Sequence, residues 1–95
     1  MEQQEPTGVD FAGFVLSLAT TAAVYFGDIA DPTTGQSAPA NLPAAAQMIE
    51  ILSMLEQKTK GNLLPPEAQL IGDLLYELRM RYVQAQQGEK RIIQP

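Results

Sequence analysis

The stretch FAGFVLSLATTAAVYF, residues 11–26, contains no charged residue and constrains the fold more than any other part of the chain. At the α-helical spacing its bulky apolar side chains gather on one broad arc, and glycine, serine and threonine gather opposite. Asp10 stands where an N-cap is expected, and Gly27 stands where a left-handed C-cap costs little. These signals predict an apolar helix over residues 10–27, against which the rest of the chain must pack.

A membrane span and a secretory signal are the alternatives to a helix buried in a soluble bundle. About 16 residues make a helix of about 24 Å, which falls short of the hydrocarbon core of about 30 Å. A secretory signal opens with basic residues, whereas this chain opens with Glu2 and Glu5. We therefore expect no membrane span, and we expect other helices and a second copy of the chain to cover this helix.

The composition sets limits on the chemistry. A chain of 95 residues suits one domain with a modest core. Cys and His are absent, which excludes disulfides, thiolate nucleophiles, imidazole bases and the usual transition-metal ligands. Asp28 and Asp31 lie close in sequence, but a calcium loop needs further oxygen ligands, so we interpret them as solvated turn acids. We predict no catalytic, cofactor-binding or metal site, and an intracellular, cytoplasmic location.

A loop over residues 28–41 is predicted after the first helix, because prolines and Gly35 interrupt any regular element. It is long for a compact helical domain, so it either crosses the domain from end to end or closes over something. Apolar residues then recur at spacings of three and four over residues 42–60, with Asn41 available as the N-cap. This pattern predicts a second, amphipathic helix.

A short turn joins the second helix to a third. Gly61 and Asn62 are the candidates for a left-handed cap, and two prolines suit the first turn of the next helix. An apolar stripe runs over residues 65–86, where Glu77 is expected to pair with Arg81 one turn later. Helices joined by so short a link form an antiparallel hairpin.

The predicted fold is therefore all-α, a single helical domain over residues 1–95. Its protomer has three helices, of which the first is strongly apolar and the other two form the antiparallel αα-hairpin. The polar segments 1–9 and 87–95 offer little apolar surface, so we expect a flexible leader and a flexible tail. The sequence leaves open whether Ile92 and Ile93 dock on the domain.

Apolar and small residues outside the main stripes predict self-association. Two amphipathic helices cannot easily cover a first helix that is apolar on so much of its circumference. Gly72 inside the third helix costs about 1 kcal/mol relative to alanine, which indicates a close approach, with the small face of the first helix as the expected neighbour. Because two-fold dimers are the commonest way to cover such surface, we predict a homodimer or higher homo-oligomer. The predicted contact residues are Gly13, Leu16, Ser17, Thr20, Val24, Gly72, Tyr76, Met80 and Val83.

The charge distribution suits packing between copies better than binding of nucleic acid. Residues 1–57 carry seven acids and no base, whereas residues 58–95 carry six bases and four acids. The expected function is a non-enzymatic interaction or structural module that binds a second copy or another protein. An enzyme is disfavoured because nothing brings two titratable groups together in a pocket. The alternative is an RNA-binding accessory protein that uses the basic hairpin tip and the third helix. Its contacts would be Lys58, Lys60, Arg79 and Arg81.

Three segments together resemble a known family. They are DFAGFVLSLATTAAVYFGDIADPTTG, the T-x-G-N-L turn from Thr59 to Leu63, and LLYELRMRY from Leu74 to Tyr82. In this order and spacing, over about residues 10–84, the chain resembles a small bacterial helical family, domain of unknown function 1844. The resemblance implies a short, helical, cytoplasmic bacterial protein without an established activity, cofactor or catalytic residue. Many relatives have a hydroxyl residue where Leu64 stands, so the cap that they imply for the third helix is missing here.

Overall fold

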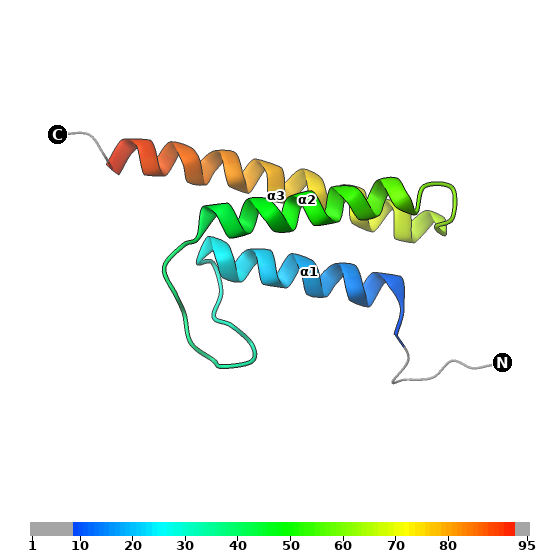
Figure 1. Cartoon of the computed structure of the whole chain (residues 1–95), viewed down its shortest axis with the longest axis horizontal. Coiled ribbons are helices and arrows are strands. Elements are labelled where there is room, and N and C mark those ends of the chain that lie inside the picture. Colours follow the sequence, from blue (N-terminus) through cyan, green and yellow to red (C-terminus); the bar gives the residue numbers. More distant parts are fainter. Residues whose placement is uncertain (1–8, 93–95) are drawn as a thin grey trace.

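Three helices lie side by side, with the second antiparallel to the first and the third, and the part of the chain that the structure describes contains no strand (Figure 1). The computed structural model describes the backbone of residues 9–92 and the side chains of residues 9–88. The helices are α1 (Phe11–Phe26), α2 (Leu42–Lys58) and α3 (Pro65–Ile92), and each packs against both of the others. The prediction of an all-α protomer with three helices is confirmed. The predicted leader lies outside the described residues, except for Val9.

Both ends of α1 are fixed by local contacts. Asp10 Oδ1 accepts a hydrogen bond from the N–H of Gly13 at 2.8 Å, which satisfies one of the free donors of the first turn. A Cβ at Gly13 would lie 2.9 Å from this oxygen, so glycine leaves room for the cap. Gly27 has a φ of +81° and donates its N–H to the carbonyl of the preceding turn. The helix therefore stops where the chain must turn.

The loop over residues 28–41 leaves and rejoins the bundle at the same end (Figure 1). The N–H of Asn41 donates to the carbonyl of Tyr25 at 2.7 Å, which ties the end of the loop to the last turn of α1. Asn41 Oδ1 also accepts from the N–H of Ala44 at 3.2 Å and so caps α2. The loop does not cross the domain, because α2 begins beside the end of α1.

The turn between α2 and α3 depends on short contacts of its own. Gly61 has a φ of +83°, the left-handed conformation that glycine adopts without steric cost. The structure ends α2 at Lys58, and the hydroxyl of Thr59 donates to the carbonyl of Leu55 at 2.7 Å. At the start of α3, Glu67 Oε1 accepts from the N–H of Leu64 at 2.8 Å. This contact is one half of a capping box, so Glu67 supports the helix start that lacks a hydroxyl cap.

α3 is longer than predicted, because it continues past residue 86 to Ile92. The predicted end of this helix at residue 86 was therefore wrong. Glutamine, glutamate, lysine and arginine are all good helix formers, and the single Gly88 costs only about 1 kcal/mol, which is too little to end a long helix. The last turns of α3 reach beyond the end of α1 and the start of α2 (Figure 1). Ile93 and the side chain of Ile92 lie outside the described part of the chain.

The core consists of two adjoining clusters along the axis of the bundle. The cluster nearer the α2–α3 turn contains Val15, Leu52, Ile71 and Leu75. The other contains Ala22, Phe26, Ala45 and Met48. Among the described residues no polar or charged side chain is buried. The fold of the described residues therefore rests on apolar burial between helices.

Candidate functional site

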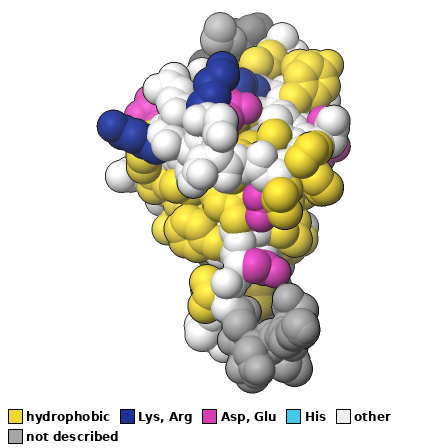
Figure 2. Space-filling model, turned by 90° about the vertical axis from the view of Figure 1, so that its right-hand side faces the viewer, with side chains coloured by type: hydrophobic (Ala, Val, Ile, Leu, Met, Phe, Trp, Pro, Cys, Tyr) yellow, Lys and Arg dark blue, Asp and Glu magenta, His cyan; other side chains and the backbone are white. Residues whose placement is uncertain are grey.

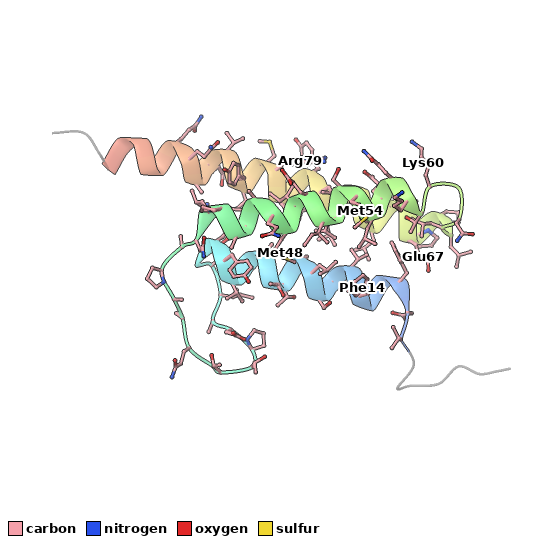
Figure 3. The ribbon with its side chains drawn as sticks, viewed as in Figure 1. Phe14, Met48, Met54, Lys60, Glu67 and Arg79 are labelled. Atoms are coloured by element: carbon pink, nitrogen blue, oxygen red, sulfur yellow. The ribbon has the colours of Figure 1, made fainter. Side chains whose placement is uncertain are left out.

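α1 exposes a face without charge on the side away from the core. We call the α1 outer face the set made up of Gly13, Phe14, Leu16, Ser17, Thr20, Thr21 and Val24. Phe14 is 47% exposed and Leu16 is 48% exposed, although both belong to the most apolar segment of the chain. Phe14 lies near the start of the helix (Figure 3). The first half of this face is exposed, whereas Thr20, Thr21 and Val24 in its second half are half-buried.

Two of the three hydroxyl groups of the α1 outer face, those of Ser17 and Thr21, have partners inside the helix. The Ser17 hydroxyl donates to the carbonyl of Phe14 at 2.7 Å, and the Thr21 hydroxyl donates to the carbonyl of Ser17 at 3.0 Å. Such bonds to the preceding turn satisfy the side-chain donors without water. Covering this face with another chain would therefore leave few polar groups without a partner, which keeps the desolvation cost low.

A second apolar surface lies on α3. Tyr76, Met80 and Val83 form what we call the α3 strip, and their side chains are 67%, 47% and 46% exposed. On one side of the strip, Arg79 Nη2 donates to Ser53 Oγ of α2 at 3.3 Å. On the other side, Arg81 turns towards the end of α1. The strip between these two arginines is therefore the outward face of α3, as the sequence indicated.

Gly72, the remaining predicted contact residue, has a different neighbour from the one expected. The nearest atom to a Cβ placed on Gly72 is Glu56 Oε2 of α2, at 3.8 Å. The small face of α1 does not lie against it in the protomer, so that expectation was wrong. The physical reason is that α2 packs beside α3 in the hairpin and places Glu56 next to this position. A Cβ at 3.8 Å would make an ordinary contact, so the space here does not require glycine.

Arg81 and Asp28 form an ion pair that the sequence did not indicate. Arg81 Nε and Nη2 donate to the two oxygens of Asp28 at 2.8 Å and 2.7 Å. The guanidinium carbon also lies 5.1 Å from the centre of the Phe26 ring, within the range of a cation–π contact. The hydrogen bonds from Arg81 lower the pKa of Asp28, and those accepted by Asp28 raise the pKa of Arg81. The predicted pairing of Arg81 with Glu77 is replaced by this contact between the end of α1 and α3.

The four basic residues proposed for RNA do not form one surface. Lys58 and Lys60 are exposed at the α2–α3 turn, whereas Arg81 binds Asp28, which follows α1 at the other end of the bundle. Lys60 and Glu67 both lie at this turn (Figure 3). Viewed from the same end, Lys and Arg side chains gather in the upper part of the molecule, and hydrophobic side chains cover much of the lower part (Figure 2). The turn therefore presents a small mixed-charge tip next to apolar surface.

The hollow at the α2–α3 turn holds no recognisable set of catalytic groups. This hollow of about 270 Å³ is lined by Glu56, Lys60 and Ile71, among others. A lysine and a glutamate at the edge of an apolar floor supply neither a nucleophile with its base nor a pair of carboxylates. Within the described residues no group of three acidic, histidine or cysteine side chains could hold a metal ion. No helix in that part of the chain is long and apolar enough to cross a membrane.

Comparison with known proteins identifies a family, but the description of that family gives no activity. Residues 8–84 match a family model described as "Domain of unknown function (DUF1844)". The match covers all of α1 and α2 and most of α3, including the α1 outer face and the α3 strip. No curated protein and no solved structure matched the chain.

Proposed function

This chain belongs to the DUF1844 family, and we propose that it is a non-enzymatic interaction module that self-associates through apolar helix faces. The observation that carries the proposal is the exposure of large apolar side chains on the outer sides of two of the three helices. On the α1 outer face these side chains stand among groups that bear no charge, and on the α3 strip they form a row about two turns long. Contiguous exposed apolar surface on a small domain is typical of a protein interface.

The absence of charged side chains from the α1 outer face supports the same proposal. A solvent-exposed helix face usually carries charged side chains, yet the α1 outer face has only glycine and hydroxyl residues beside its apolar ones. The hydroxyls of Ser17 and Thr21 donate within the helix, so a partner does not have to satisfy them. Burial of this face would gain apolar contact at a small polar cost.

The RNA-binding alternative has weaker support. The chain carries a net charge of −5, whereas affinity for nucleic acid comes mainly from neutralising phosphates with lysine and arginine. Of the four bases considered for this role, Arg81 is engaged with Asp28 and Arg79 donates to Ser53. Lys58 and Lys60 then remain at the turn beside Glu67 and Glu56, which offers RNA a small and mixed patch.

The cellular setting that we propose is the bacterial cytoplasm. The absence of cysteine suits a reducing compartment, and the family resemblance points to bacteria. The partner that we propose first is a second copy of the chain, with another protein as a further partner of the same surfaces.

The proposal is tested by multi-angle light scattering on the full chain over a dilution series. We expect a mass well above the 10.3 kDa of the protomer at high concentration, falling on dilution. A mass of one protomer at every concentration would contradict self-association. An RNA gel-retardation assay over a range of salt concentrations addresses the alternative, because binding through phosphates weakens steeply as salt increases.

A further inference from the structure

We propose that a second copy of the chain binds the α3 strip, with the two α3 helices antiparallel about a two-fold axis near Met80. This inference rests on the proposed self-association and states its surface and orientation. It places Tyr76 of one copy against Val83 of the other. Three independent features of α3 carry the argument.

The first feature is the position of the strip. Arg79 reaches α2 on one side and Arg81 reaches Asp28 on the other, so the surface between them faces away from the whole bundle. The most exposed aromatic side chain of the described residues, Tyr76, lies on it at 67% exposure. A second helix could therefore lie along α3 without displacing α1 or α2.

The second feature is the charge of α3, which changes sign in the middle of the helix. Residues 65–78 contain three acids and no base, so they carry −3, whereas residues 79–92 contain four bases and one acid, so they carry +3. An antiparallel pair sets the acidic half of each copy beside the basic half of the other. A parallel pair sets like charges side by side, which is unfavourable.

The helix dipole does not account for this charge pattern. Its effect is confined to the first and last turns of a helix, where it explains Glu67. Asp73 and Glu77 lie further along α3, are exposed, and form no ion pair with another described side chain. Gln69 is the side chain that donates to Asp73, at 3.0 Å and 3.1 Å. Both carboxylates are therefore available to the basic half of a second copy.

The third feature is that the middle of α3, the point where its charge changes sign and the centre of the α3 strip lie within about two residues of one another. The middle of α3, a helix of 28 residues, falls between Leu78 and Arg79. The sign of the charge changes between Glu77 and Arg79, and Met80 is the central residue of the α3 strip. About a two-fold axis at this point, the α3 strip of one copy faces the α3 strip of the other, and each acidic half of α3 faces a basic half. The two helices also overlap along most of their length. A surface that binds its own copy about such an axis must be complementary to itself in this way.

Crosslinking through single cysteines tests the orientation, since the chain has no cysteine of its own. Gln69→Cys and Gln87→Cys each place one thiol on the exposed side of α3, and a short bismaleimide joins thiols that lie close together. With the axis near Met80, the two Gln69 positions of a dimer lie about 33 Å apart along the helices, whereas Gln69 of one copy is offset by only about 6 Å along the helices from Gln87 of the other. Packed helices lie about 8–10 Å apart, so the mixed pair alone is within reach of the crosslinker. We therefore expect a crosslinked dimer from the mixture of the two variants, and none from either variant alone.

The other outcomes overturn the inference in distinguishable ways. Crosslinking of each variant on its own indicates a parallel pair. No crosslinking in the mixture, with a dimer still present by light scattering, places the interface elsewhere and leaves the proposed function intact. A protomer mass for the cysteine-free chain overturns both proposals together.

Charge reversal on the acidic half of α3 gives a second and independent readout. Asp73→Lys with Glu77→Lys makes both halves of α3 basic, so we expect the dimer dissociation constant to rise at least tenfold. The control is Gln47→Lys with Gln57→Lys, which adds two lysines at exposed positions on the outward side of α2 and should leave the constant unchanged. An equal effect of the two pairs, or none from the α3 pair, would overturn the proposed charge complementarity.

Discussion

The ion pair between Arg81 and Asp28 allows the packing of α3 against the end of α1 to be tested quantitatively. Both side chains are partly exposed, Arg81 at 34% and Asp28 at 40%, so solvent screens the pair. A well-formed surface pair contributes about 0.5–1 kcal/mol, and the two parallel hydrogen bonds place this one at the upper end of the range. The contact of Arg81 with the Phe26 ring adds about 0.5 kcal/mol.

These magnitudes rank three variants. Asp28→Asn should cost about 0.5–1 kcal/mol of unfolding free energy, because it removes the ion pair and keeps the cation–π contact. Arg81→Met removes both and should cost about 1–1.5 kcal/mol, while its apolar stem is retained. The double variant should reveal a coupling energy of about 0.5–1 kcal/mol in a double-mutant cycle by urea denaturation. A coupling energy near zero would refute the assignment of the pair as a stabilising contact.

The pair also predicts a dependence of stability on pH. The hydrogen bonds from Arg81 lower the pKa of Asp28 in the folded state, so the unfolded state takes up a proton first as the pH falls. The contribution of the pair is fully present above the unfolded carboxyl pKa of about 4 and is lost as the pH falls through the lower folded value. The difference in unfolding free energy between the wild type and Asp28→Asn should therefore stay constant from about pH 7 to about pH 5 and shrink below about pH 4. A difference that grows on acidification would contradict this sign.

Three further substitutions test the local features that define the fold. Leu52→Ala removes a fully buried side chain from the cluster near the α2–α3 turn and should lower the unfolding free energy by about 2–5 kcal/mol. Its control, Met54→Ala on the exposed side of α2, should change the unfolding free energy by less than about 0.5 kcal/mol. Gly61→Val forces a β-branched residue into a φ of +83° and should cost about 1 kcal/mol or more, although beyond the two adjacent residues no atom lies within 4 Å of the new Cβ. An unchanged melting temperature would show that the turn adapts. Asp10→Ala removes the cap of α1 and should cost about 0.5–2 kcal/mol in thermal unfolding, and Asp10→Ser, which can still accept from Gly13, should restore most of that loss.

The fold could be predicted from the sequence where local signals decide it. Asp10 and Gly27 mark the ends of α1 because a cap needs only a side-chain acceptor or a positive φ within one turn. The turn at Gly61 and the hairpin that follows depend on equally short spacings. The exposed positions of Tyr76, Met80 and Val83 also followed from helical periodicity, since a residue opposite the main stripe of a helix points away from the core.

Features that depend on contacts distant in sequence could not be predicted in this way. Asp28 and Arg81 are separated by most of the chain, so periodicity favoured Glu77 as the partner of Arg81, one turn away. The neighbour of Gly72 was assigned to α1 because the sequence does not indicate on which side of α3 each helix packs. The end of α3 was placed too early because polar residues past residue 86 were interpreted as disorder, although they are good helix formers.

Sedimentation equilibrium of the wild type beside Tyr76→Glu with Met80→Glu tests the central claim most directly. At about ten micromolar or above, a concentration at which many weak homodimers form, the wild type should have the mass of two protomers of 10.3 kDa. The double variant places two carboxylates on the α3 strip and should shift to the mass of one protomer, with the helical circular-dichroism signal retained. A control with Gln47→Glu and Gln57→Glu adds the same charge to α2 and should remain dimeric. A wild type that sediments as a single protomer, or a double variant that stays dimeric like its control, would contradict self-association through α3.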